Sequence, residues 1–264
     1  MLPSAPILSA SNLRVSYGTF RALDNVSLEV DHGEALAVIG ANGAGKSTLA
    51  RALSGLIKAA AGRIRFDGTD ITDLSASHIY RAGLTHLPEG RGIFQYLSVA
   101  DNLRVAVRIM PNRRSRTEAL DRVFETFPIL KARRTQLAGT LSGGEQQMLS
   151  LAKALANWPK VLVADEIGLG LAPKVIDELY AQLDQARREG LTVVLIEQYL
   201  DRALAFADRT VVLDRGTIAW SGSVADADVN AISLQYIGQG ALHEVTRSEN
   251  AHSGVPFDSQ ETGS

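Results

Sequence analysis

The stretch VIGANGAGKST, residues 38–48, joins an apolar run at 36–39 to a helical pattern that begins after Gly45. It fits the pattern G-x-x-x-x-G-K-[ST] from Gly40 to Ser47, in the strand-to-helix setting that the pattern requires. The glycines let successive backbone N–H groups curl around phosphates, and a helix N-terminus adds the positive end of its dipole. The stretch therefore predicts a nucleotide triphosphate site in an α/β fold.

Within this loop we expect Lys46 to reach the β- and γ-phosphates and Ser47 to hold Mg²⁺. A glycine-rich turn that binds nothing is the alternative, and it is disfavoured because the pattern and its setting agree. The other predicted nucleotide-binding residues of the loop are Gly40, Asn42, Gly43, Ala44, Gly45 and Thr48.

A second motif, VLVADE at 161–166, is an apolar strand that ends in two acids. Hydrolysis of a phosphoanhydride needs one carboxylate near Mg²⁺ and another near the attacking water. We therefore predict Asp165 as the metal-side carboxylate and Glu166 as the general base. Taken alone, two acids at a strand end are more often a solvated turn or an N-cap, but the phosphate loop upstream favours the catalytic interpretation.

A third motif, LSGGEQQ at 141–147, opens a helix. Ser142 and Glu145 have the spacing of a capping box, and Gly143 and Gly144 leave the first N–H groups of the helix uncovered. Such a helix start is ordinary by itself. Because the phosphate loop already supplies one cradle, a second anion site is better explained by the nucleotide of another subunit, with two chains head to tail.

The periodicity divides the chain into segments. Strands with alternating faces occupy 7–72, and helical periodicity follows, with N-caps predicted at Ser98 and Ser115. The pattern after Pro159 returns to α/β. We expect a core formed by 1–74 and 159–240, an inserted helical subdomain at about 75–158, and a disordered polar tail at 241–264.

Composition excludes several classes of function. Lys and Arg total 27 against 29 Asp and Glu, so no global charge indicates nucleic acid as a partner. The chain has no cysteine, which excludes disulfides and thiolate chemistry. No signal peptide or apolar run long enough to span a bilayer is found, so a membrane role needs partner subunits. The histidines lie outside the motifs and we interpret them as surface or packing residues: His32, His78, His86, His243 and His252.

In order and spacing, these motifs resemble the ATP-binding subunits of ABC transporters, over roughly residues 7–238. The resemblance implies an α/β P-loop NTPase of the ABC ATPase type, with a mixed sheet, antiparallel N-terminal strands and an inserted helical subdomain. It also implies two cassettes that sandwich two ATP molecules, with Ser142, Gly143 and Gly144 contacting the partner's γ-phosphate. Tyr17 matches the aromatic residue that stacks on adenine, although a strand-edge aromatic in the core is the alternative.

Two departures from the family pattern narrow the resemblance. Glu89 stands where most members carry glutamine, and Gln198 stands where most carry a switch histidine. With EQQML and GLGLAP, they resemble the subgroup that imports branched-chain amino acids, or its relatives for urea and short amides. The resemblance places Glu89 at the ATP and metal site and Gln198 at the catalytic site. Ile167 and Gly168 replace the subgroup's usual Pro-Ser, which leaves the shape of that loop open.

The resemblance also implies partners and a location. These are permease subunits docked near the loop at 89–92, a second cassette of the same or another kind, and indirectly an extracytoplasmic solute-binding protein, at the cytoplasmic face of a bacterial-type inner membrane. Two alternatives stay open. The chain could be an ATP-binding but weakly hydrolysing partner cassette, an alternative that Gln198 leaves open, or a soluble ABC protein acting on nucleic acid, which the single cassette and absent basic run disfavour.

Overall fold

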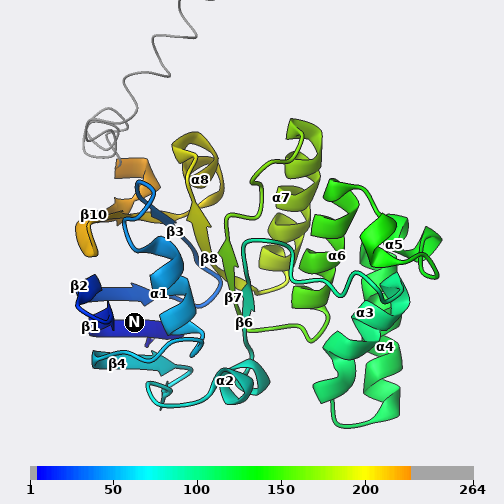
Figure 1. Ribbon diagram of the computed structural model, residues 1–264, viewed down its shortest axis with the longest axis horizontal. Coiled ribbons are helices and arrows are strands. Elements are labelled where there is room, and N and C mark those ends of the chain that lie inside the picture. The colour runs from blue at the N-terminus through cyan, green and yellow to red at the C-terminus, as the bar shows by residue number, and fades with distance from the viewer. Residues whose placement is uncertain (1–4, 227–264) are drawn as a thin grey trace, which may run out of the picture. The chain divides into compact units, whose positions relative to one another are not determined.

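Two β-sheets organise the computed structural model, which describes residues 5–226 (Figure 1). A four-stranded antiparallel sheet has the order β2-β1-β4-β5, and a six-stranded sheet has the order β10-β9-β3-β8-β7-β6. In the larger sheet only the edge pair β10–β9 is antiparallel. The strands are β1 (Leu8–Tyr17), β2 (Phe20–Val30), β3 (Ala35–Ile39), β4 (Ala61–Phe66), β5 (Thr69–Asp70), β6 (Leu84–Leu87), β7 (Val161–Asp165), β8 (Thr192–Glu197), β9 (Arg209–Asp214) and β10 (Thr217–Ser223).

Helices cover the larger sheet, and α1 lies between the two sheets (Figure 1). None of the helices within residues 5–226 is long and apolar enough to cross a bilayer. The α-helices are α1 (Lys46–Leu53), α2 (Ala76–Ala82), α3 (Val99–Ala106), α4 (Arg113–Thr126), α5 (Pro128–Ala132), α6 (Gly143–Leu155), α7 (Pro173–Arg188) and α8 (Leu200–Phe206).

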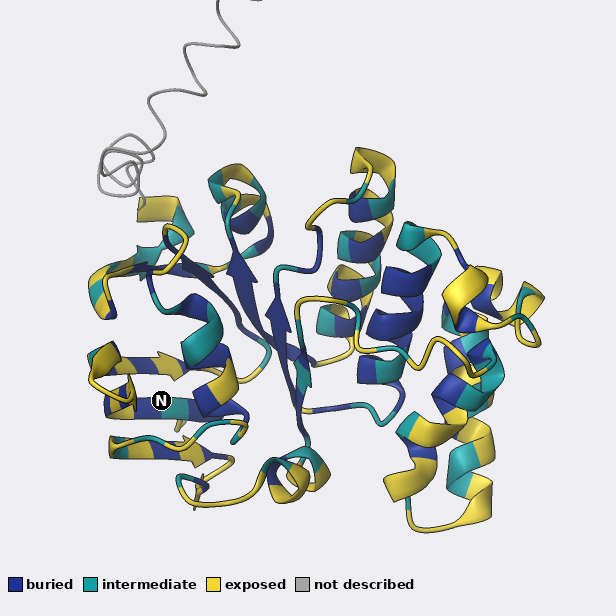
Figure 2. Ribbon diagram, in the orientation of Figure 1, coloured by how far each residue is buried: buried dark blue, intermediate teal, exposed yellow. Residues whose placement is uncertain are grey.

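The central strands β3, β7 and β8 are buried along their whole length (Figure 2). Strands covered on both faces are typically continuous apolar runs, as these three are apart from Thr192 and the acids that end β7 and β8. In the register, Asp165 lies opposite Ile196, and Ile39 lies opposite Glu197. The carboxyl ends of the three strands therefore meet at one edge of the sheet, where the segments that follow them come together.

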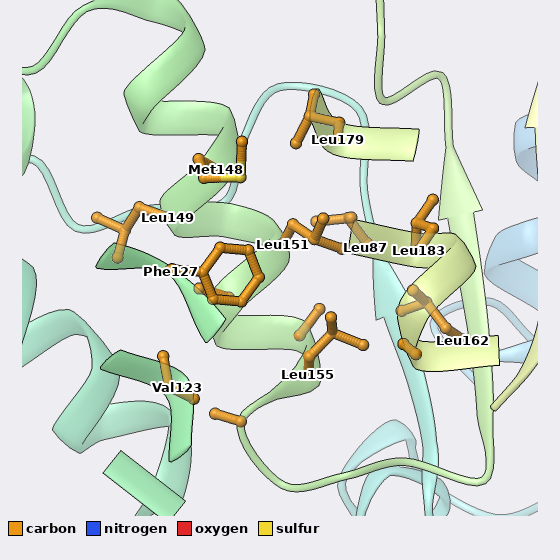
Figure 3. Packing of buried hydrophobic residues seen from close by; sticks show 14 of the residues in the cluster. Leu87, Val123, Phe127, Met148, Leu149, Leu151, Leu155, Leu162, Leu179 and Leu183 are labelled. Carbon is orange, nitrogen blue, oxygen red and sulfur yellow. The ribbon is translucent and has the colours of Figure 1, made fainter. Parts of the chain in front are cut away.

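Helix α6 connects the sheet to the other helices. Its side chains Met148, Leu149, Leu151 and Leu155 belong to one core cluster that also contains sheet residues and residues of α3, α4 and α7 (Figure 3). Nine of its residues are buried. Because core packing is dense, the N-terminus of α6 has a defined position relative to the sheet.

Two of the three predicted N-caps are confirmed. The Ser98 hydroxyl accepts a hydrogen bond from the Asp101 N–H, and Ser142 and Glu145 form the complete capping box. The prediction of a cap at Ser115 is wrong, because α4 starts earlier and the Asn112 side chain accepts the hydrogen bond from the Ser115 N–H.

The range 75–158 is not wholly helical. Strand β6 lies within it and pairs in parallel with β7, so this short segment belongs to the core sheet. The continuous helical segment begins later, with α3 at Val99. The division into two subdomains stays a prediction, and the predicted tail at 241–264 lies outside the described residues.

Candidate nucleotide-binding site

The loop between β3 and α1 requires glycine at two positions. A Cβ at Gly40 would lie 2.3 Å from the backbone oxygen of Leu213, and one at Gly45 would lie 2.7 Å from that of Ala22. Gly45 also has a φ of 107°, which side chains disfavour. The loop is therefore packed against the neighbouring strands, and Asn42, Gly43 and Gly45 line the cavity beside it.

Lys46 lies at the base of this loop and is 4% exposed. Its Nζ donates to the backbone oxygen of Gly40 at 2.7 Å and to that of Ala41 at 3.3 Å, and it lies 3.7 Å from Glu166 Oε1. Burial lowers the pKa of the ammonium, and Glu166 and Asp165 oppose that shift. The lysine thus links the phosphate loop to the acids at the end of β7.

Asp165, the last residue of β7, is 2% exposed and accepts a hydrogen bond from Ser47 Oγ at 3.3 Å. Burial raises the pKa of its carboxyl from 3.8 to about 6, although the Ser47 hydrogen bond opposes the shift. Glu89 and Glu166 raise this pKa further through their charges. A cation at this position would relieve the cost of the buried charge.

The side chains fit a magnesium ion that is shared with phosphates. Mg²⁺ keeps several waters and takes only one or two carboxylates from nucleotide-binding proteins. Ser47, Asp165 and Glu89 match that donor set, and residues 5–226 contain no cluster of three or more His, Cys, Asp or Glu suited to a metal.

Glu166 follows Asp165 in a left-handed conformation with a φ of 47°, and its N–H donates to the backbone oxygen of Ile196. The next residue, Ile167, is buried in the core cluster of α6 and α7. Here Ile167, in place of the subgroup's proline, anchors the loop by packing. The turn leaves the Glu166 side chain partly exposed in the cavity next to Lys46.

Most of the predicted site residues line one cavity of about 540 Å³. Two aromatic residues of the β1–β2 hairpin, Tyr17 and Phe20, form one wall and are 46% and 62% exposed. Gly40, Ala44 and Asp165 are among the predicted residues that do not line this cavity. Its predicted lining residues are Tyr17, Asn42, Gly43, Gly45, Lys46, Ser47, Thr48, Glu89, Glu166 and Gln198.

The sequence interpretation missed Phe20 and a buried acid at the end of β8, Glu197. The Tyr180 hydroxyl donates to Glu197 Oε1 at 2.7 Å, and the Gln198 N–H donates to Oε2 at 3.2 Å. Burial raises the pKa of both Glu197 and Tyr180. Glu197 thus fixes the backbone of Gln198 at the cavity edge. An acid that ends an apolar strand, as in VLVADE, was the available signal.

Ser142, Gly143 and Gly144 do not line this cavity. The capping box leaves the N–H groups of Gly143 and Gly144 without an intrahelical acceptor. A Cβ at Gly144 would lie 2.7 Å from Val175 Cγ1, so close packing of α6 on α7 also requires glycine there. A chain therefore has a complete phosphate loop and, elsewhere, a second helix start suited to an anion.

The histidines contribute nothing to the cavity lining within residues 5–226. His32 and His78 are exposed, and His78 Nδ1 lies 2.8 Å from Ser75 Oγ. His86 lies on β6, where burial lowers its pKa to about 4. His243 and His252 lie outside the described residues.

A family model described as ABC transporter matches residues 23–167, more than half of the chain. The chain belongs to the ABC transporter family. This ABC transporter protein is 45% identical over 212 residues to the high-affinity branched-chain amino acid transport ATP-binding protein BraG of Pseudomonas aeruginosa, covering 80% of this chain and 91% of BraG. It is 33% identical over 218 residues to the probable branched-chain amino acid transport ATP-binding protein LivF of Archaeoglobus fulgidus, covering 82% of this chain and 92% of LivF.

The fold of this ABC transporter protein is that of solved cassettes. An ATP-binding cassette of an ABC transporter in its ADP conformation matches with a TM-score of 0.75 and 27% identity, covering 88% of this chain and 99% of that chain. A nucleotide-free cassette matches with a TM-score of 0.73 and 27% identity, covering 86% and 98%. The predicted ABC ATPase fold, with its antiparallel N-terminal strands, is confirmed.

Proposed function

We propose that this chain is the ATP-hydrolysing subunit of an importer for branched-chain amino acids or related small solutes. It would work with permease subunits, a second cassette and, indirectly, an extracytoplasmic solute-binding protein, at the cytoplasmic face of a bacterial-type inner membrane. One observation carries the proposal: Lys46, Ser47 and Glu166 line one cavity, and Asp165 accepts a hydrogen bond from Ser47 there. The named substrates of BraG and LivF support the solute class.

The phosphate loop would bind ATP before any chemistry occurs. Backbone N–H groups of the phosphate loop would contact the phosphates, and Lys46 would exchange its loop carbonyl acceptors for the β- and γ-phosphates. Tyr17 stacks on the adenine ring from the hairpin wall. Mg²⁺, held by Ser47 and Asp165 near Glu89, would neutralise charge that develops on the transferred phosphoryl group.

Glu166 is the proposed general base. Its carboxylate lies at the cavity, next to Lys46, and can accept a proton from the attacking water. Gln198 reaches the same cavity from the end of β8, where its amide can donate a hydrogen bond to a γ-phosphate oxygen. Unlike a histidine, this amide can position the γ-phosphate but cannot become a cation near neutral pH.

The helix start at Ser142–Gly144 would bind the γ-phosphate of the ATP held by the second cassette. Closure then adds contacts that exist only with a triphosphate, and hydrolysis removes them, so the two cassettes separate. Movement of the loop at 89–92, which we place beside the permease, would carry this closure to the transport path.

In a second candidate function, the chain binds ATP but hydrolyses it weakly. Gln198 supports it, because a site without the switch histidine could bind ATP while a partner cassette performs most of the turnover. The charge at this site favours hydrolysis instead, since Lys46, Mg²⁺ and the partner's helix end already supply positive charge to the γ-phosphate.

Uptake by cells tests the proposal. Cells that lack the chromosomal copy of this chain are complemented with the wild type, Lys46→Ala or the surface control Arg114→Ala, and labelled leucine, valine and urea are supplied separately. We expect the wild type and the control, whose guanidinium is exposed on α4, to restore leucine and valine uptake equally. Lys46→Ala should restore none. Restored uptake of urea alone would assign the chain to the other importer group, and restored uptake of none of the three would contradict the solute class.

A further inference from the structure

The loop at 88–95 is bound along one face of α6. Three side chains spaced four and three residues apart, Gln146, Ser150 and Lys153, each hold a group of this loop. Arg91 Nη1 donates to Gln146 Oε1, Ser150 Oγ donates to the backbone oxygen of Arg91, and Lys153 Nζ donates to that of Gly92 at 2.6 Å. Side chains at this spacing lie on the same side of a helix.

Arg91 has an unfavourable backbone conformation. Its φ is 72°, between Gly90 at 87° and Gly92 at 55°, so three successive residues are left-handed. Only glycine tolerates this region readily, and a long side chain persists there only when its surroundings hold it. The contacts with α6 therefore hold Arg91 in this backbone conformation, which its own conformational preference does not favour.

The Arg91 guanidinium covers the first residue of α6. A Cβ built on Gly143 would lie 3.1 Å from Nη2, so the guanidinium occupies the space where a side chain of residue 143 would be. Gln146 Oε1 accepts the hydrogen bond from the other terminal nitrogen of Arg91, Nη1. The Gln146 side chain is 8% exposed and donates to the backbone oxygens of Ala138 and Leu141. The guanidinium is thus fixed beside the uncovered N–H groups at the helix start.

The same loop reaches the nucleotide cavity at its other end. Glu89 and Glu166 line both that cavity and a neighbouring hollow of about 400 Å³, which Arg91 and Gln146 also line. Arg91 forms no ion pair with any carboxylate of residues 5–226, and its guanidinium donates through Nη1 to the neutral amide of Gln146. These contacts fix the position of the Arg91 side chain. They leave its positive charge unneutralised near the proposed site for the partner's phosphate.

We propose that Arg91 is a positioning residue for the site at Ser142–Gly144: it fixes the start of α6 to the loop that carries Glu89. Binding of the partner's ATP at Ser142–Gly144 is then coupled to the placement of Glu89 at this chain's own ATP site. The inference rests on the proposed function, since it needs a second cassette to supply that ATP. It predicts that loss of Arg91 weakens closure between cassettes and leaves ATP binding by the separate chain unaffected.

The test measures the two binding steps separately in the full chain. In a Glu166→Gln background, sedimentation gives the ATP-dependent association of the chain with its second cassette, and calorimetry on the separate, dilute chain gives its affinity for ATP. Arg91→Ala should weaken association about tenfold, as loss of a hydrogen bond from a charged group implies. The ATP affinity of the separate chain should stay within about twofold, as for a surface change. Arg91→Lys should recover part of the loss.

Two further variants keep the test decisive. Ser150→Ala removes a hydrogen bond to the Arg91 carbonyl without altering any side chain at the helix start, and it should weaken association in the same direction even where Arg91→Ala fails to fold. Arg114→Ala, an equal change on the exposed face of α4, should change neither quantity.

Association that is unchanged in both Arg91→Ala and Ser150→Ala would overturn the inference and leave the proposed function standing. Parallel losses of association and ATP affinity would also overturn it, because they indicate general loosening of the chain. No ATP-dependent association of the Glu166→Gln chain with its second cassette would overturn the two together.

Discussion

Replacement of Asp165 by asparagine should stabilise the protein while it abolishes Mg²⁺-dependent ATPase activity. The carboxyl is 2% exposed, accepts one hydrogen bond from Ser47 and lies near the charges of Glu89 and Glu166. Asparagine keeps an oxygen acceptor for the Ser47 hydroxyl but has no charge to bury. The substitution therefore removes the proposed Mg²⁺ ligand and, at the same time, the free-energy cost of burying a charged carboxylate.

The magnitude follows from the pKa of Asp165, which burial raises from 3.8 to about 6. A folded-state pKa above the unfolded value means that the folded protein binds the proton more tightly, so stability is lost as pH rises from about 4 to about 6. Ionising this carboxyl costs the folded state about 3 kcal/mol at neutral pH. Asp165→Asn should therefore increase the free energy of unfolding by about this amount above pH ~6 and by progressively less below it.

Urea unfolding of both proteins checks this, in a chelating buffer without nucleotide and at several pH values between about 5 and about 8. Parallel ATPase assays with Mg²⁺ should show no turnover by the variant. A variant that is less stable than the wild type at neutral pH, or a stability difference that does not shrink toward acid pH, would show that the buried Asp165 charge does not carry this cost.

The remaining predictions concern ATP itself. Lys46→Ala should abolish tight ATP binding, since it removes the cation that neutralises the β- and γ-phosphates; undiminished affinity in calorimetry would contradict the loop assignment. Tyr17→Ala should weaken ATP binding by about 1 kcal/mol, with Tyr17→Phe near the wild type, because an aromatic ring is what stacks; equal losses in both variants would exclude stacking. Gln198→Ala should lower the ATPase rate of the reconstituted complex about tenfold or more. A rate that survives Gln198→Ala but is lost in the partner's equivalent variant would make this chain the non-hydrolysing half.

The parts of the fold and site that local sequence determines were predictable. The phosphate loop, the acids that end β7 and the capping box at Ser142 and Glu145 each depend on residues close together in the chain. Parallel packing then brings the ends of β3, β7 and β8 to one edge of the sheet, so that most of the predicted residues line one cavity. Their roles in binding and catalysis stay predictions.

Features that depend on distant contacts were missed. Strand β6 is short, and the spacing of Leu84 and Leu87 fits a helix as well as a strand, so only its pairing with β7 reveals it. Arg91 has no local signal, because its position is set by α6 more than fifty residues later in the chain. Phe20 faces the cavity only because the hairpin register places it opposite Tyr17.

An ATP-bound structure of the Glu166→Gln protein with its second cassette would test whether two cassettes share each ATP. We expect each γ-phosphate to lie between the phosphate loop of one cassette, with Lys46 or its counterpart in contact, and the helix start at Ser142–Gly144 or its counterpart in the other. ATP held by one chain alone, with Ser142–Gly144 open to solvent, would contradict it.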